Sequence, residues 1–213
     1  MIDWLARRAA KVADDGRWVV LDVESSGLDP KRDRLLAIAG IAVRRSPDGA
    51  PCVALADSFE VVLRQPEAPV DKANILVHGI GVGAQREGTD PARALEAFER
   101  WVGAAPLIGF HVAFDEALIQ RAMRSALGRT LANPWIDLAD VAPVVRPDIA
   151  GRSLDEWMDA LGIRCAVRHQ AAADTLATAE LLLLLWPQVL AQKQGSDWQA
   201  LARLAAQRRW LPR

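Results

Sequence analysis

An apolar run that ends in two carboxylates is the feature that most restricts how this chain can fold. Residues 17–23 read RWVVLDV, and they lie between Asp15-Gly16 and Ser25-Ser26-Gly27. The length of the run and its branched residues predict a buried β-strand. Because side chains alternate between the two faces of a strand, Asp22 and Glu24 project from the same face at its end. Two carboxylates this close repel each other unless positive charge lies between them.

This pair of carboxylates has two interpretations. Mg²⁺ and Mn²⁺ favour oxygen ligands and would supply the positive charge, which makes Asp22 and Glu24 candidate metal ligands. Alternatively, Glu24 begins a solvated loop and Asp22 caps a turn. Taken alone, the D-x-E pattern at a strand end does not decide between them.

Two further acidic positions follow later in the chain. Asp115 comes directly after His111-Val112-Ala113-Phe114 at the predicted start of a helix, where a carboxylate also interacts favourably with the helix dipole. Asp174 lies in the first turns of another predicted helix, among alanines and leucines, where a buried acid requires a partner. His169 precedes that helix, and a lone histidine there is more often a hydrogen-bonded structural residue. Each position therefore has a structural explanation beside a catalytic one.

The rest of the chain alternates predicted strands and helices. A short polar link at 46–49 suits a hairpin, and 66–89 reads as loops and short helices. Three adjacent strands, followed by strands that alternate with helices, predict an α/β fold with a mixed sheet. Further strands are expected at 35–43, 53–63, 107–110 and 134–137, and helices at 4–12, 91–102, 114–127, 153–161, 172–192 and 197–209.

Composition limits the function classes. The 213 residues allow one domain with at most a helical appendage. The net charge of −1 gives no global sign of a nucleic-acid or membrane partner. Two cysteines, Cys52 and Cys165, are too few for a disulfide framework or a zinc site. The longest apolar stretch, Leu181 to Trp186, is far shorter than the roughly 20 residues of a membrane helix, and the first residues are too charged for a signal peptide. We therefore expect a cytoplasmic protein with no membrane association.

Taken together, these acids and histidines resemble the DEDDh (DnaQ-like) 3′–5′ exonuclease family. That family includes the epsilon proofreading subunit of bacterial DNA polymerase III, ribonuclease T and oligoribonuclease. Its first motif, D-x-E-[ST]-[ST]-G-L, is matched at every position by residues 22–28. His78-Gly79-Ile80 and the segment 153–163 also resemble parts of the family, so the resemblance spans about residues 17–190.

The second and third family motifs are matched with one departure each. Val112 stands where Asn is usual after the histidine, and Thr175 stands where Ala is usual after the last aspartate. The missing Asn would affect substrate handling or site geometry, but it removes no metal ligand. The positions that are kept are His111, Phe114 and Asp115 in the second motif and His169, Ala171 and Asp174 in the third.

The resemblance implies a ribonuclease H-like fold, a five-stranded mixed sheet flanked by helices, and a mechanism with two Mg²⁺ or Mn²⁺ ions per active site. In that mechanism Asp22 bridges the ions, Glu24 and Asp174 complete the ion on the nucleophile side, and Asp115 acts on the second. His169 is the implied general base, which takes a proton from the attacking water so that a nucleoside 5′-monophosphate is released. Five positions separate His169 from Asp174, which is not one helical face, so we expect His169 on a mobile loop.

The resemblance also implies substrate contacts. Leu28 would wedge against the last bases, Glu24 would also reach the 3′-hydroxyl, and Phe114 would pack beside the terminal nucleotide. Leu28 and Phe114 could equally cover the core, and His78 either touches the nucleotide or stabilises its own loop. The implied substrate-binding set is Ser25, Gly27, Leu28, His78 and Phe114.

We therefore predict a 3′–5′ exonuclease that acts on single-stranded DNA 3′ ends. The alternatives are an exoribonuclease that trims RNA 3′ ends and, from another class, a non-catalytic module that binds nucleic acid or protein. The presence of all five catalytic side chains argues against the last. A polymerase or another protein is a further expected partner.

The predicted organisation is an N-terminal helix at 1–16, an exonuclease domain at 17–192 and a basic C-terminal helix at 193–213 packed on that domain. The last segment holds five basic residues against Asp197 alone. Trp198 and Trp210 could stack on bases there, although docking of the helix onto the domain is the favoured interpretation.

Overall fold

The computed structural model describes residues 16–46, 49–65 and 72–210, so the helix expected at 4–12 lies outside the described residues. One five-stranded sheet, in the order β3-β2-β1-β4-β5, forms its centre. β2 is antiparallel to β1 and β3, whereas β4 is parallel to β1 and β5 is parallel to β4. This mixed sheet confirms the predicted α/β class. The strands are β1 (Arg17–Ser25), β2 (Leu35–Arg45), β3 (Pro51–Val62), β4 (Leu107–Gly109) and β5 (Trp135–Asp137).

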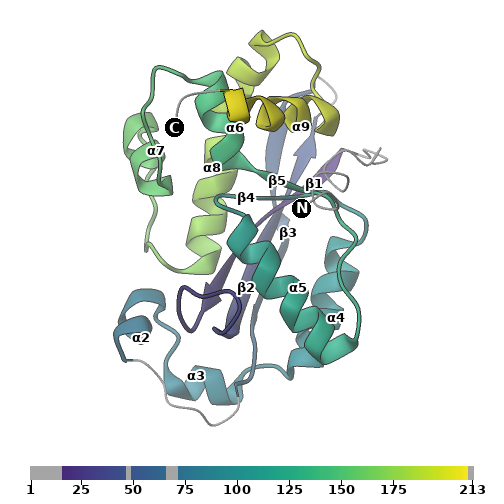
Figure 1. The fold of residues 1–213 in the computed structure, drawn as a ribbon, viewed down its shortest axis with the longest axis vertical. Coiled ribbons are helices and arrows are strands. Elements are labelled where there is room, and N and C mark those ends of the chain that lie inside the picture. The colour runs from purple at the N-terminus through teal and green to yellow at the C-terminus, as the bar shows by residue number, and fades with distance from the viewer. Residues whose placement is uncertain (1–15, 47–48, 66–71, 211–213) are drawn as a thin grey trace.

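Helices flank the sheet, with α2 and α3 at one end of the molecule and α9 at the other (Figure 1). A 3₁₀ turn at Arg208–Trp210 follows α9. The helices are α2 (Lys72–His78), α3 (Val82–Glu87), α4 (Pro91–Val102), α5 (Ala113–Leu127), α6 (Leu138–Val145), α7 (Leu154–Leu161), α8 (Ala171–Ala191) and α9 (Trp198–Gln207).

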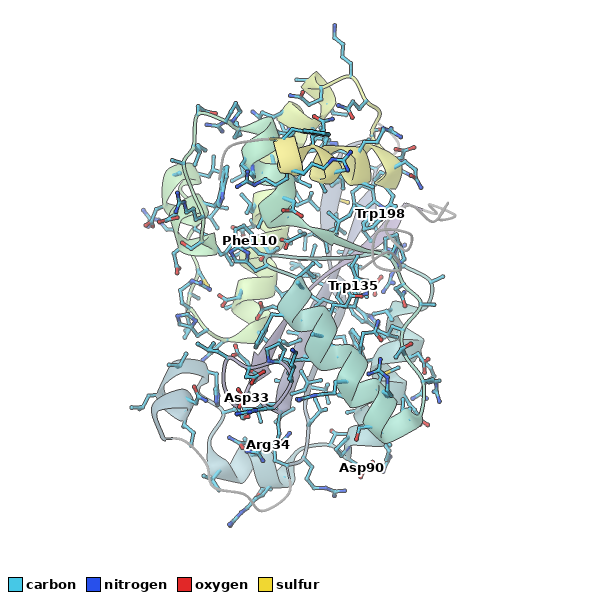
Figure 2. The ribbon with its side chains drawn as sticks, in the orientation of Figure 1. Asp33, Arg34, Asp90, Phe110, Trp135 and Trp198 are labelled. Carbon is cyan, nitrogen blue, oxygen red and sulfur yellow. The ribbon has the colours of Figure 1, made fainter. Side chains whose placement is uncertain are left out.

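The alternation of β1 divides the hydrophobic core into two clusters. Trp18 and Val20 point to a cluster formed with α6, α7, α8 and α9. Val19 and Leu21 point to the opposite cluster, formed with α4 and α5. Figure 2 labels one tryptophan from each cluster, Trp198 of α9 and Trp135 of β5.

Asp22 and Glu24 continue the first of these two faces. They are two and four residues beyond Val20, so the period of two places them on the side of the sheet that α8 covers. The apolar residues of that face give way to carboxylates at the end of the strand, next to the beginning of α8. The fold therefore directs the acidic pair toward a helix that carries a third acid, Asp174.

Several helix ends follow the signals in the sequence. Asp90 caps α4 by accepting from the backbone N–H groups of Ala92 and Arg93. Gly128 ends α5 with a φ of 67°, a left-handed conformation that glycine adopts without steric cost. The hairpin link is also confirmed, since the N–H of Ser46 donates to the carbonyl of Ala50.

One helix was missed in the sequence. α6 begins at Leu138, where the Asp137 side chain accepts from the N–H of Ala139 at 2.9 Å. The helix is only eight residues long and contains Pro143, which weakens the periodic signal. α9 is shorter than expected, because the chain passes into the 3₁₀ turn at Arg208.

α8 is the central helix of the first cluster. Among the described helices it alone is long and apolar enough to cross a membrane, but 56% of its most apolar 18-residue stretch is buried inside the fold, as in the core helix of a globular domain. Pro187 lies within this helix. Cys52 and Cys165 are both free thiols.

The C-terminal helix α9 lies against α6. Trp198 is 1% exposed and packs edge-on against Trp18 with ring centroids 6.2 Å apart, so it docks the helix rather than offering a surface for bases. Trp210 is exposed, and the guanidinium of Arg209 lies over its ring.

Candidate active site

The candidate site begins at the carboxyl end of β1. Asp22 and Glu24 are both half-buried. Their partners across the β1–β2 ladder are Ala39 and Ala37, both of which are buried. Asp22 and Glu24 therefore lie two residues apart on one face of β1.

Two helix N-termini bring the other acids to this strand end. Asp115 lies in the first turn of α5 and is 5% exposed, and Asp174 lies in the first turn of α8 and is 6% exposed. The backbone N–H of Val23 hydrogen-bonds to the Asp115 carboxylate, and the N–H of Ala171 hydrogen-bonds to Glu24. The positive ends of both helix dipoles thus point at the acidic cluster, which lowers the cost of gathering negative charge there.

The four carboxylates are close enough to perturb one another. Burial, and then the charges of Asp115 and Asp174, raise the pKa of Asp22 well above its usual range. Burial and the charges of Asp22 and Asp174 raise the pKa of Glu24 to about 8. Burial is also the main cause of the raised pKa of Asp115. Side chains from β1, α5 and α8 therefore share one electrostatic environment, in which additional positive charge would be strongly stabilising.

Oxygen donors of this kind fit a hard divalent cation in chemistry, burial and charge. In the described part of the chain, however, no group of three or more His, Cys, Asp or Glu side chains stands together as ready ligands of one ion. A cation is already present beside the acids, since the guanidinium of Arg168 forms an ion pair with Asp174. Arg168 therefore supplies positive charge to the acidic cluster from the protein itself.

Asp174 is also tied to the loop that precedes α8. Its Oδ2 accepts from the backbone N–H of His169 at 3.1 Å, and the thiol of Cys165 lies 3.7 Å from its Oδ1. His169 has a φ of 60°, which is unusual for a residue with a side chain, and its side chain is exposed. The imidazole acts electrostatically on Asp155 of α7. The structure therefore brings the four acids together, but it leaves the predicted base turned outward.

The second motif is built around a residue that the sequence did not single out. Asp137, at the end of β5, accepts from the N–H of His111 at 2.9 Å and holds that residue at a φ of 57°. The Nε2 atom of His111 lies 2.9 Å from the carbonyl oxygen of Arg152. The charge of Asp137 also contributes to the raised pKa of Asp115. His111 thus connects strand, loop and helix rather than facing the carboxylates.

Val112, which replaces the family's Asn, is a core residue. It is 2% exposed and belongs to the cluster formed with α4 and α5. A side chain at Gly109 would approach Val112 to 2.8 Å, so the two positions fit closely. Thr175, the other departure, is 2% exposed and donates its hydroxyl to the carbonyl of Ala39 at 3.3 Å, which attaches α8 to the strand beside Asp22.

The β1–β2 loop is organised by Asp33, another residue that sequence reasoning missed (Figure 2). Its carboxylate accepts from the hydroxyl of Ser26 and from the N–H of Asp29. A Cβ at Gly27 would lie 2.5 Å from this carboxylate, so a larger residue there would displace Asp33. The hydroxyl of Ser25 donates to the carbonyl of Gly27. Ser25 and Gly27 shape the loop.

The remaining predicted contact residues differ in exposure. Leu28 is 92% exposed at the tip of the β1–β2 loop, so it does not cover the core. Phe114 is half-buried against the cluster of α4 and α5. His78 is 5% exposed, and its Nδ1 accepts from the N–H of Ile80 at 3.0 Å, which stabilises its own loop. Burial lowers the pKa of His78.

Arg168, Asp137 and Asp33 carry contacts that the motifs did not identify. For Asp137 a signal existed, because the carboxyl ends of the parallel strands β1, β4 and β5 meet at one edge of the sheet. For Arg168 and Asp33 no periodic or motif signal distinguished these residues from other charged residues in loops.

Residues 19–182 match the sequence model of the exonuclease family RNase T. Among curated proteins, the chain is 26% identical over 176 residues to a PolC-type DNA polymerase III of Bacillus subtilis, covering 82% of this chain and 12% of that protein. It is 29% identical over 178 residues to a DNA polymerase III subunit epsilon-like protein of Rhodobacter capsulatus, covering 82% of this chain and 24% of that protein. The chain thus spans only a small part of the relatives it matches.

Among solved structures, exonuclease I of E. coli in complex with a dA16 oligonucleotide matches with a TM-score of 0.69 at 18% identity, covering 82% of this chain and 41% of that one. An exonuclease I from Methylocaldum szegediense matches with a TM-score of 0.63 at 21% identity, covering 82% and 43%. These likenesses confirm the ribonuclease H-like fold. Since the family match covers most of the chain and agrees with the motifs and the sheet, the chain belongs to the RNase T family of exonucleases.

Proposed function

We propose that this protein is a 3′–5′ exonuclease of the DEDDh type, similar to the epsilon subunit, which removes nucleotides from single-stranded DNA 3′ ends. The observation that carries the proposal is the convergence of Asp22, Glu24, Asp115 and Asp174 from three separate elements on one buried, mutually repelling cluster. Carboxylates gathered in this way are unfavourable for stability alone, which supports a functional reason for their placement.

The four carboxylates are the proposed ligands of two Mg²⁺ or Mn²⁺ ions. Such ions, when bound, stabilise the charge that develops on the attacking and leaving oxygens of a phosphodiester. Asp22 is central in this assignment, because its carboxylate is perturbed by both Asp115 and Asp174. Glu24 and Asp174 would hold the ion on the side of the attacking water, and Asp115 would act on the second ion.

His169 is the proposed general base. Its imidazole would accept the proton of the attacking water. Because the side chain is exposed in this structure, the loop at 162–170 has to turn before the imidazole reaches the cluster. The exposed Leu28 is the proposed wedge against the last bases, and the half-buried Phe114 is the residue proposed to pack beside the terminal nucleotide.

Ser25, Gly27 and His78 complete the proposed substrate-binding set. Ser25 and Gly27 hold the β1–β2 loop in the shape that presents Leu28. His78 positions the loop after α2, and its ring is already engaged with Ile80. Residues 17–192 form the proposed nuclease domain, with 193–213 as a basic appendage that offers a surface to a polymerase or another protein partner.

The experiment that tests this function uses oligonucleotides of DNA and RNA labelled at either end. Incubation with Mg²⁺, Mn²⁺ or EDTA should release labelled mononucleotides early from 3′-labelled DNA and give a ladder from 5′-labelled DNA, in the metal samples only. Asp22→Asn serves as the matched inactive control. Faster cleavage of RNA would assign the protein to RNA 3′-end trimming. No metal-dependent release from either substrate would leave a non-catalytic binding module as the remaining interpretation.

A further inference from the structure

Arg168 connects two helices across the candidate site. It lies on the loop between α7 and α8, where its Nε donates to Oδ1 of Asp155 in the first turn of α7. Its Nη1 forms an ion pair with Oδ1 of Asp174 in the first turn of α8. The Asp174 side chain is 9% exposed and the Asp155 side chain is 55% exposed, so the guanidinium extends from solvent into the acidic cluster.

The charge of Arg168 reaches beyond its direct partners. It lowers the pKa of Asp22 and of Glu24, and so opposes the effects of burial and like charge at both residues. An arginine keeps its charge at any pH at which the protein is folded. The guanidinium therefore offsets part of the repulsion that the four carboxylates would otherwise experience.

A divalent cation and Arg168 compete for the same atom. The Oδ1 of Asp174 contacts the guanidinium, and Oδ2 accepts from the backbone of His169, so both oxygens are engaged in this conformation. A hard cation at Asp174 requires one of these oxygens, together with oxygens from neighbouring carboxylates. Two positive groups cannot occupy one carboxylate oxygen of a buried side chain without strong mutual repulsion.

We propose that Arg168 is the internal counter-ion of the metal-free site, and that it leaves Asp174 when a divalent cation binds there. The proposal rests on the proposed function for the identity of that cation. Asp155 provides the position to which the guanidinium withdraws, since this second carboxylate is largely exposed and already contacts Nε.

The test is calorimetric titration of Mn²⁺ into the full chain without nucleic acid. Arg168→Gln removes the competing charge and should bind Mn²⁺ about 10-fold more tightly or better, the equivalent of one charge-assisted hydrogen bond. Arg164→Gln is the matched control, because Arg164 is an exposed arginine on the same loop, and its affinity should equal that of the wild type. Asp155→Asn should act in the opposite direction and weaken binding by a factor of about 2–5, because Arg168 then has Asp174 as its main anchor.

Thermal unfolding gives the readout that separates a counter-ion from a merely structural residue. In EDTA the melting temperature of Arg168→Gln should fall below that of the wild type, and Mn²⁺ should raise it by more than it raises the wild type. Equal losses in EDTA and in Mn²⁺, with unchanged Mn²⁺ affinity, would mean that the arginine only braces α7 against α8, and the proposal would be wrong. Should the Gln variant fail to fold, Arg168→Met also removes the charge while keeping an apolar stem of similar length, and an Mn²⁺ affinity no higher than that of the wild type would overturn the proposal.

Failure of this inference is distinguishable from failure of the proposed function. A wild type that binds Mn²⁺ yet cleaves no oligonucleotide would refute the nuclease activity and leave the counter-ion role to be judged from the variants. A wild type that cleaves, with Arg168→Gln binding Mn²⁺ no more tightly, would refute the counter-ion role alone. Absence of Mn²⁺ binding in every variant would refute both.

Discussion

The backbone N–H of His169 donates to Oδ2 of Asp174 at 3.1 Å, so the proposed base and a proposed metal ligand are joined through the main chain rather than through the imidazole. The hydrogen bond fixes one end of the loop while the side chain of His169 remains exposed. The proposed turn of the loop at 162–170 would therefore bring the imidazole to the site with Asp174 as the fixed point. The left-handed φ of 60° marks the residue at which this rotation would occur.

His169→Ala should reduce cleavage of a 3′-labelled oligonucleotide by about 10²–10⁴-fold, the usual effect of removing a positioned general base. Because the bond to Asp174 uses the backbone, the variant should bind Mn²⁺ as tightly as the wild type. Single-turnover cleavage and calorimetry measure the two effects separately. A variant with wild-type cleavage rates would remove His169 from the mechanism.

Asp22→Asn should abolish activity and stabilise the metal-free protein. Burial and the neighbouring charges of Asp115 and Asp174 disfavour the charged form of Asp22. A neutral side chain of the same shape therefore relieves repulsion in the folded state. In EDTA we expect a melting temperature above that of the wild type. We expect the cleavage rate to fall by more than the about 10–100-fold loss that is typical when a residue hydrogen-bonded to a metal ligand is replaced. A melting temperature below that of the wild type would contradict the clustering of charge.

Val112→Asn restores the residue usual in the family, yet it should harm this protein. The position is 2% exposed in an apolar cluster, so the amide would lack hydrogen-bond partners and lower the free energy of unfolding by about 1–3 kcal/mol. Denaturant unfolding measures the loss, with Val112→Ala as the control for lost packing alone. Unchanged stability together with faster cleavage would show that an Asn at this position still serves the substrate.

Thr175→Val should loosen the beginning of α8. The substitution keeps the shape of the side chain but removes the hydroxyl that donates to Ala39 on β2, at a cost of about 1 kcal/mol in the free energy of unfolding. Thr175→Ser retains the hydroxyl and serves as the control for that hydrogen bond. Since Ala39 lies opposite Asp22, we also expect the Thr175→Val variant to bind Mn²⁺ more weakly than the Thr175→Ser variant.

Asp57→Asn tests the electrostatics of the sheet edge away from the site. Asp57 accepts from Arg17, Arg44 and Trp101, and these partners, the Arg17 side chain foremost, hold the pKa of Asp57 well below its usual range. A lowered pKa stabilises the folded protein above the unfolded pKa of about 3.9, and that stability is lost as the pH falls toward the folded value. The difference in melting temperature between wild type and variant should be constant above about pH 5 and shrink below about pH 4.

A difference in melting temperature between wild type and Asp57→Asn that instead grew as the pH fell would have the wrong sign for a carboxylate with a lowered pKa. The variant should retain nuclease activity near pH 7, because Asp57 pairs with Arg17 at the start of β1, whereas Asp22 and Glu24 lie toward the end of that strand. Loss of cleavage without loss of stability would contradict this placement.

The sequence by itself determined the elements and the identity of the acids. The alternation of β1 places Asp22 and Glu24 on one face because the strand repeat is two, and this follows from local backbone geometry alone. Asp90 and Gly128 likewise mark helix ends through contacts within a few residues. The motifs identify Asp115 and Asp174 but do not indicate where the fold places these residues.

Only the tertiary structure decided how these groups interact. Arg168 rests on Asp155 and Asp174, which lie 13 and 6 positions away in the sequence, and the pairing depends on how α7 and α8 approach each other. Asp137 supports His111 for the same reason, since β5 and the end of β4 are neighbours only in the folded sheet. Local propensity acts over a few residues, whereas the choice of ion-pair and hydrogen-bond partners depends on the packing of whole elements, which no single segment encodes.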